Sequence, residues 1–149
     1  MSYLIVHGPN LNLLGEREPD IYGTLTEDVI AQSVVDACGK EVDLFQSNHE
    51  GDLIDELHKA PQNYEGVIIN PGALTHYSYA IYDAIRAINI PVVEVHISDI
   101  TNREPFRAKS VTAPACAAQF FGEGLQSYLK AVQFLEDYEV HDTEESEVD

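Results

Sequence analysis

The chain has 149 residues, of which 44% are hydrophobic, so it is long enough and apolar enough to fold around a core of its own. Its 26 acidic and 8 basic residues give a net charge of −18, which argues against nucleic-acid binding because that function needs a basic surface. No apolar run is long enough to cross a bilayer and the N-terminus carries no signal sequence, so we expect a cytoplasmic protein without membrane contact.

Acidic residues are concentrated at the C-terminus. Residues 136–149 hold eight carboxylates and no lysine or arginine, and such a segment is expected to be solvated. We therefore expect a single domain over residues 1–138 and a mobile acidic tail over residues 139–149. Cys38 and Cys116 are far apart in the sequence and are expected to be free thiols.

The N-terminal part of the chain alternates between strand and helix signals. The apolar residues 3–6 predict a strand. Thr24 and Glu27 have the spacing of a capping box, which predicts a helix that begins at Thr24 and ends at Gly39. Residues 41–46 then predict a second strand.

The middle of the chain repeats this alternation. A short helix with Leu53 and Leu57 on its apolar face is expected to end before Pro61, because proline breaks a helix interior. Residues 66–70 are almost continuously apolar, as in a central parallel strand that is buried on both faces. A regular apolar stripe over residues 80–88 predicts the next helix.

The remaining elements complete the pattern. Residues 91–95 predict a strand with its proline at the first position, residues 110–113 a short edge strand, and residues 125–135 the last helix. This alternation predicts an α/β fold: a flavodoxin-like, doubly wound, five-stranded parallel sheet with strand order 2-1-3-4-5.

Ligands of such sheets bind beyond the carboxyl ends of the strands, and polar residues and one glycine follow three of the predicted strands there. They are Asn10 after the first strand, Asn70, Gly72 and His76 after the third, and His96 and Ser98 after the fourth. We therefore expect a polar site at this edge of the sheet.

Several chemistries do not fit this edge. It has no glycine-rich phosphate loop, no serine in a nucleophile elbow and no lysine suited to a Schiff base. His76 and His96 lack a third metal ligand at an obvious spacing. Acid–base chemistry without metal or cofactor remains.

Tyr22 is a candidate base in the loop after the first strand. A phenol has a pKa near 10, and the guanidinium of Arg17 nearby would favour the phenolate. The plainer interpretation is that the Tyr22 ring packs on the first helix and Arg17 is a surface charge; each residue taken alone favours it.

His96 is the candidate acid. Residues two apart on a strand face the same way, so we expect Glu94 beside the imidazole. A strand-end histidine with a structural hydrogen bond is an equal alternative. Backbone N–H groups of Ile97 and Ser98 could bind a carboxylate, while Arg107 lies either at the site or in a salt bridge.

Three segments closely resemble the type II 3-dehydroquinate dehydratases: VHGPNLNLLGEREPDIYG, INPGALTHYSYAIYDAI and EVHISDITNREPFRAKS. The resemblance runs from about residue 3 to the last helix. It implies a small enzyme of the shikimate or quinate pathway that reversibly dehydrates 3-dehydroquinate to 3-dehydroshikimate. The implied reaction is an anti elimination through an enolate, with no metal or other cofactor.

The resemblance also implies a role for each matching residue. Tyr22 is the base, Arg17 activates it, His96 protonates the departing hydroxyl, Asn10 positions a water at the enolate, and Glu94 orients the histidine. The implied substrate contacts are Asn70, Gly72, His76, Ile97, Ser98 and Arg107, with Asp83 reaching the site of a neighbouring subunit. The family is commonly a dodecamer built from trimers, so we expect a homo-oligomer of this kind.

Residues 99–102 and 108–109 depart from the usual family sequence, outside the implied base and acid. Two other interpretations stay open. One is a flavodoxin-like binding or scaffold protein, which we would expect to have lost Tyr22, Arg17 or His96. The other is a different lyase or hydrolase acting on a related cyclic polyol acid.

Overall fold

The computed structural model describes residues 2–16, 25–100 and 103–148, with side chains described as far as Tyr138. Within these ranges five parallel strands form one sheet in the order β2-β1-β3-β4-β5. The strands are β1 (Ser2–His7), β2 (Glu41–Gln46), β3 (Gly66–Asn70), β4 (Val92–His96) and β5 (Ala118–Phe121). The predicted flavodoxin-like fold and strand order are therefore confirmed.

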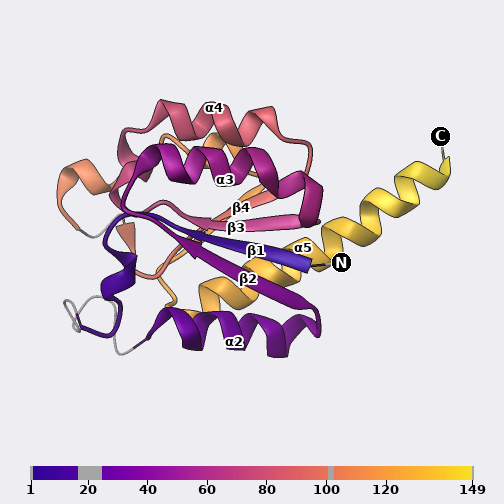
Figure 1. The fold of residues 1–149 in the computed structure, drawn as a ribbon, viewed down its shortest axis with the longest axis horizontal. Helices are drawn as coiled ribbons and strands as arrows, with labels where there is room; N and C mark the ends of the chain where they lie inside the picture. The colour runs from indigo at the N-terminus through magenta and orange to yellow at the C-terminus, as the bar shows by residue number, and fades with distance from the viewer. Residues whose placement is uncertain (1, 17–24, 101–102, 149) are drawn as a thin grey trace.

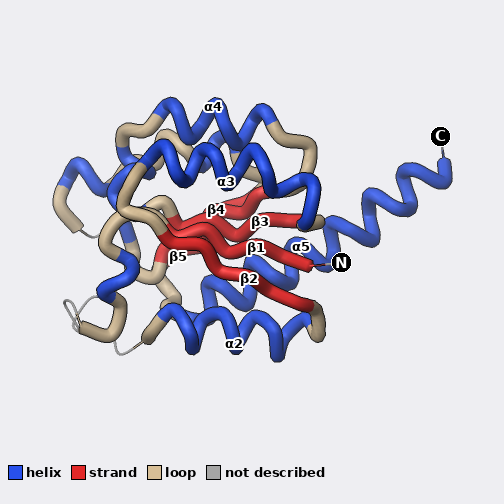
Figure 2. The backbone as a smooth tube through the Cα atoms, viewed as in Figure 1, coloured by secondary structure: helices blue, strands red, loops and turns tan. Residues whose placement is uncertain are grey.

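Helices cover both faces of this sheet. They are α2 (Glu27–Cys38), α3 (Glu50–Asn63), α4 (Tyr79–Ala87) and α5 (Leu125–Val148). Figures 1 and 2 show α2 and α5 together on one face and α3 and α4 on the other. Short 3₁₀ turns lie in the connections, at Leu11–Leu13, Gly72–His76, Pro105–Arg107 and Ala113–Ala115.

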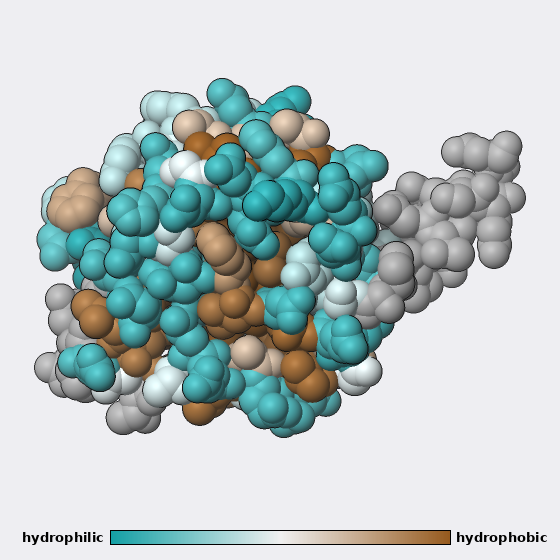
Figure 3. Space-filling model, in the orientation of Figure 1, coloured by the Kyte–Doolittle hydropathy of each residue, from teal (hydrophilic) through white to brown (hydrophobic). Residues whose placement is uncertain are grey.

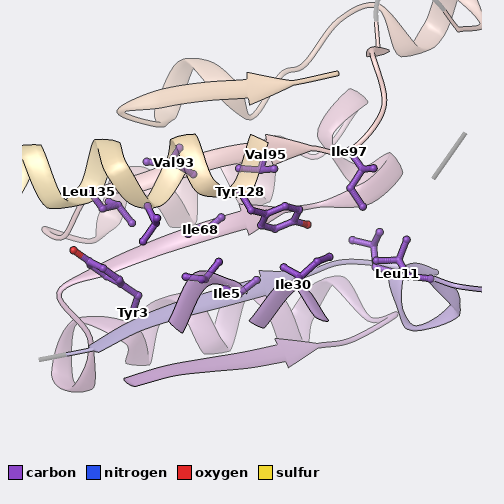
Figure 4. Close-up of a cluster of buried hydrophobic side chains, with 14 residues drawn as sticks. Tyr3, Ile5, Leu11, Ile30, Ile68, Val93, Val95, Ile97, Tyr128 and Leu135 are labelled. Carbon is purple, nitrogen blue, oxygen red and sulfur yellow. The ribbon is translucent and has the colours of Figure 1, made fainter. Parts of the chain in front are cut away.

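The alternation of side chains along the strands produces two cores. In β1, Tyr3 and Ile5 point towards α2 and α5, whereas Leu4 and Val6 point towards α3 and α4. Figure 4 shows the first of these cores, in which helix residues such as Leu135 lie over the sheet. Each fully buried side chain of this size contributes roughly 1.5–3 kcal/mol, so both faces hold the strands in register.

Figure 3 shows polar residues over most of one face, with apolar side chains gathered between α2 and α3, where the β2 edge of the sheet lies. In β2, Glu41 and Asp43 alternate with partly buried Val42 and Leu44. Charges on an edge strand disfavour pairing with a strand from another molecule.

Helix α2 begins later than the capping-box pattern predicted. Thr26 is the N-cap, and its hydroxyl accepts a hydrogen bond from the Val29 N–H at 3.2 Å. Thr24, the predicted cap, lies outside the described residues, and Glu27 bonds to His7 rather than back to the cap. The predicted C-terminal signal is confirmed, because Gly39 ends the helix at a φ of 67°.

Helix α3 does not end before Pro61, as predicted, but continues through it to Asn63. Proline lacks the amide hydrogen that would bond one turn back, so the helix loses a bond there. Leu57 and Ala60 are buried in the same stretch, and Tyr64 N–H closes the helix on the Ala60 carbonyl at 2.9 Å. Burial of this face and closure of the last turn outweigh the missing bond.

The prediction of an edge strand at residues 110–113 was wrong. The strand at this edge is β5, four residues long, which pairs with β4 from Ala118 opposite Val93 to Phe121 opposite His96. The hydroxyls of Ser110 and Thr112 instead bond to the carboxylate of Glu94. These side-chain bonds tie the segment, which forms a turn, to the middle of β4.

Helix α5 continues through Val148, so much of the acidic segment extends the last helix, which projects beyond the body of the protein in Figure 1. The mobility of the tail remains a prediction. Over the part of the chain that the structure describes, no helix combines the length and apolar character needed to span a membrane.

Candidate active site

A pocket opens at the carboxyl ends of β1, β3 and β4, where the sequence predicted a site. It is lined by Pro9, Asn10, Leu11, Asn70, Gly72, Ala73, His76, His96, Ile97, Ser98, Ile100, Arg103 and Arg107. Eight of the predicted site residues are therefore brought together here: Asn10, Asn70, Gly72, His76, His96, Ile97, Ser98 and Arg107.

Two tight backbone turns meet beside this pocket, and Pro9 and Gly72 from them belong to its lining. The Gly8 N–H donates to the Asn70 carbonyl at 2.8 Å, and a Cβ at Gly8 would lie 2.2 Å from the Pro71 carbonyl oxygen. Gly72 has a φ of +63°, and a Cβ there would lie 3.0 Å from the Pro9 oxygen. Only glycine allows both close approaches without displacing main chain.

Asn10 and Asn70 are held by these turns. Asn10 has a left-handed φ of 72°, and its N–H donates to the side-chain oxygen of Asn48 at 2.9 Å. Asn70 is 3% exposed, and its Oδ1 accepts from the Gly72 N–H at 3.1 Å. Its Nδ2 donates to the Tyr128 hydroxyl at 3.2 Å.

The predicted contact between Glu94 and His96 is present. The His96 Nε2 lies 2.9 Å from Oε2 of Glu94, and both residues are buried. Ser110 donates to the same carboxylate at 2.7 Å and Gln119 at 2.8 Å, while Thr112 donates to its other oxygen.

Burial alone would raise the pKa of Glu94, but the hydrogen bonds and charge of His96 and the bonds from Thr112 and Ser110 hold it below its usual value. Glu94 is therefore a carboxylate at neutral pH. Because a carboxylate only accepts hydrogen bonds, the His96 hydrogen that faces it lies on Nε2. Nδ1 is the ring nitrogen left to exchange a proton with a ligand.

His76 and Arg107 lie at the rim of the pocket. His76 Nδ1–H donates to the Lys109 carbonyl at 2.6 Å. Its partial burial lowers its pKa, and the neighbouring charges of His96 and Arg107 act in the same direction. Arg107 donates to Glu104 at 2.6 Å, and its guanidinium lies 4.8 Å from the Phe106 ring centre. Arg107 thus combines the two predicted alternatives, because it lines the pocket and also forms a salt bridge.

Four predicted residues are absent from the lining of this pocket in the described part of the chain, one of which, Glu94, lies behind His96 and contacts it. Asp83 lies on α4, exposed, and does not line the pocket. Arg17 and Tyr22, the predicted activator and base, lie outside the described residues. Nowhere in the described ranges do three or more His, Cys, Asp or Glu side chains form a group suited to a metal ion.

Sequence reasoning missed the residues that support the predicted ones. Thr75, Ser110, Thr112 and Gln119 surround Glu94 and His96, and His7, Glu27 and Tyr128 connect to Asn70. Ser110 and Thr112 could have been identified from the sequence. Hydroxyl side chains two residues apart can point the same way and bond to one carboxylate. No local pattern pointed to Tyr128, which is 121 residues from its partner His7.

Comparisons with known proteins agree with this architecture. The family model described as Dehydroquinase class II matches residues 1–136. A 3-dehydroquinate dehydratase from Caldicellulosiruptor bescii is 53% identical over 138 residues, covering 90% of this chain and 95% of the relative. Another, from Clostridium beijerinckii, is 53% identical over 140 residues, covering 91% and 96%.

Among solved structures, the type II dehydroquinase from Butyrivibrio crossotus superposes with a TM-score of 0.87 at 45% identity, covering 91% of this chain and 97% of that one. The type II dehydroquinase from Propionibacterium acnes gives a TM-score of 0.84 at 38% identity, covering 90% and 94%. Sequence, fold and pocket thus lead to one assignment: the chain belongs to the class II dehydroquinase family.

Proposed function

We propose that this chain is a lyase that reversibly dehydrates 3-dehydroquinate to 3-dehydroshikimate. Family membership supports the substrate. The observation that carries the chemistry is the buried Glu94–His96 pair, of which His96 lines the pocket at the strand ends. A carboxylate that holds one ring nitrogen of a histidine leaves the other nitrogen oriented for proton transfer. Expulsion of hydroxide as water needs such an acid.

The elimination needs a base and an acid on opposite faces of the substrate. We assign the base to Tyr22, whose phenolate Arg17 would stabilise as a fixed cation. The phenolate takes a proton from carbon, the electron pair forms an enolate, and a water held by Asn10 stabilises the enolate oxygen. The C–O bond then breaks as His96 delivers a proton from Nδ1 to the departing hydroxyl, which leaves as water.

The remaining rim residues bind the substrate in this proposal. Asn70 and His76 hydrogen-bond its hydroxyls, Gly72 shapes the turn beneath it, and the backbone of Ile97 and Ser98 receives its carboxylate. Arg107 adds a positive charge at the rim.

Asp83, exposed on α4, would act on a neighbouring subunit's site. We propose a homo-oligomer, a dodecamer built from trimers, that acts in the cytoplasm in shikimate or quinate metabolism without metal or other cofactor.

A direct assay tests the proposal. Addition of 3-dehydroquinate to the purified protein should produce the ultraviolet absorbance of a conjugated enone. Borohydride added with substrate should leave the enzyme active, because no lysine imine forms. An enone signal that is absent at high enzyme concentration, or that borohydride abolishes, would overturn the proposed function or its mechanism.

A further inference from the structure

A series of hydrogen bonds, partly exposed only at Glu27, ends on Asn70, which lines the pocket. His7, the last residue of β1, places Nδ1 2.7 Å from Oε2 of Glu27 and Nε2 2.8 Å from the Tyr128 hydroxyl. The same hydroxyl receives Nδ2 of Asn70 at 3.2 Å. His7 and Asn70 are opposite one another in the β1–β3 register, so the sheet itself sets their spacing.

Three of these polar groups are buried away from water, so each needs hydrogen-bond partners within the protein to offset its lost hydration. His7 and Tyr128 are both 0% exposed, and Asn70 is 3% exposed. Figure 4 shows the Tyr128 hydroxyl directed towards the end of the sheet where Leu11 and Ile97 lie, both of which line the pocket. An unsatisfied polar group at such a position costs about 1–3 kcal/mol, so a single consistent set of donors and acceptors is strongly favoured.

Only one direction of hydrogen bonding satisfies every member. Glu27 as a carboxylate only accepts, so the His7 hydrogen lies on Nδ1 and Nε2 accepts from the Tyr128 hydroxyl. The phenol oxygen then accepts from Asn70, whose Oδ1 accepts from the Gly72 N–H at 3.1 Å. If the Asn70 amide were rotated by about 180°, its NH₂ group would face the Gly72 N–H, and two donors cannot form a hydrogen bond.

A directly catalytic role for Tyr128 does not fit these observations. Its hydroxyl is fully buried and lines no part of the pocket, although the Glu27–His7–Tyr128 order resembles a catalytic triad. Burial raises the pKa of Tyr128 well above its usual value, so the phenol stays protonated. The series of hydrogen bonds instead fixes the orientation of the Asn70 amide.

We propose that His7, Glu27 and Tyr128 are positioning residues that fix which end of the Asn70 amide faces the ligand. They use one hydrogen of Nδ2, and Gly72 uses one lone pair of Oδ1. One N–H and one lone pair therefore remain in known places for a substrate hydroxyl. This inference rests on the proposed role of Asn70 in binding the substrate.

A double-mutant cycle between Tyr128→Phe and Asn70→Ala tests it. Tyr128→Phe removes the partner of the Asn70 amide and should raise KM about tenfold with kcat changed far less. In the Asn70→Ala background the same change should have almost no further effect on KM, because the group that Tyr128 positions is gone. An undiminished effect in that background would overturn the inference.

Tyr3→Phe is a matched control. Tyr3 is another buried tyrosine of the same core, but its hydroxyl lies 3.4 Å from Lys40 and points away from the pocket end of the sheet in Figure 4. Removal of the Tyr3 hydroxyl should lower the stability of the protein without raising KM. A KM increase in Tyr3→Phe equal to that in Tyr128→Phe would assign both effects to general loosening of the core and refute positioning.

Glu27→Gln keeps the test decisive if Tyr128→Phe fails to fold. Its side chain is 22% exposed, and an amide there no longer dictates which His7 nitrogen carries the hydrogen. KM should rise about two- to tenfold, and a wild-type KM would refute the inference. If Asn70→Ala alone leaves KM unchanged, the proposed substrate contact fails instead, so the two failures are distinguishable.

Discussion

Replacing Glu94 by glutamine tests the role of the Glu94–His96 pair in the proposed site. The carboxylate accepts from His96, Ser110 and Gln119 at Oε2 and from Thr112 at Oε1. The amide oxygen can take the Oε2 position and keep three of these four bonds. The Thr112 hydroxyl can rotate to accept from the new NH₂. The shape is therefore retained, and what is lost is the negative charge beside His96.

A hydrogen bond to a charged group is worth about 1.5–3 kcal/mol. At 1.4 kcal/mol per factor of ten, Glu94→Gln should lower kcat about 10- to 150-fold through a less stable imidazolium, with a folded protein. The enone assay measures the rate and urea unfolding measures stability. The reasoning is wrong if Glu94→Gln folds normally and turns over at the wild-type rate.

Glu65→Gln is the matched control for this change. Glu65 is also a poorly exposed carboxylate, with 8% of its side chain accessible, but it bonds Lys40 at 2.6 Å near the start of β3, away from the pocket. The Glu65→Gln variant should be less stable than the wild type but have the same kcat. A similar loss of kcat in both variants would show that the assay reports general destabilisation.

Three further changes give separate tests. Gly8→Ala places a Cβ 2.2 Å from the Pro71 oxygen and should destabilise the protein by at least about 1–3 kcal/mol in urea unfolding; Gly51→Ala, where nothing lies within 4 Å, should not. Because the folded pKa of Glu94 lies below its usual value of 4.5, its stabilisation is present above that value and is lost as pH falls through the folded pKa. The difference in unfolding free energy between wild type and Glu94→Gln should therefore shrink as the pH is lowered below 4.5, and a constant difference would contradict this. Tyr22→Phe should abolish turnover while equilibrium dialysis still detects substrate binding, and surviving turnover would remove Tyr22 as the base.

The central strands could be predicted from the sequence because of how they are buried. Every residue of β3 and β4 is buried, so each appears as an apolar run with few interruptions. Strand β5 was missed because it is four residues long, only partly buried, and defined by its pairing with β4. The cap of α2 was misplaced because two threonines stand two residues apart, and only the backbone conformation selects Thr26.

The part of the site that lies at the strand ends could be predicted, because the sheet topology determines which residues meet there. Parallel strands end at one edge, which brings Asn10, Asn70 and His96 to the same pocket. Most of the supporting residues come from other helices, loops and strands that are distant in the sequence, as Tyr128 does from α5. Their contacts depend on how the layers pack, and no periodicity of the local sequence encodes that packing.

The interlocked glycine turns have a consequence for how this site can change over time. Beside the pocket, main-chain contacts exclude any side chain at Gly8 and strain one at Gly72. Substitutions are therefore tolerated less at these turns than at the side chains that line the pocket, and five of those lining residues lie in the connection between β4 and β5. Two of the arginines, Arg103 and Arg107, and both segments that depart from the family sequence lie in that connection. This is the part of the protein in which we expect substrate preference to diverge while the geometry beneath it stays constant.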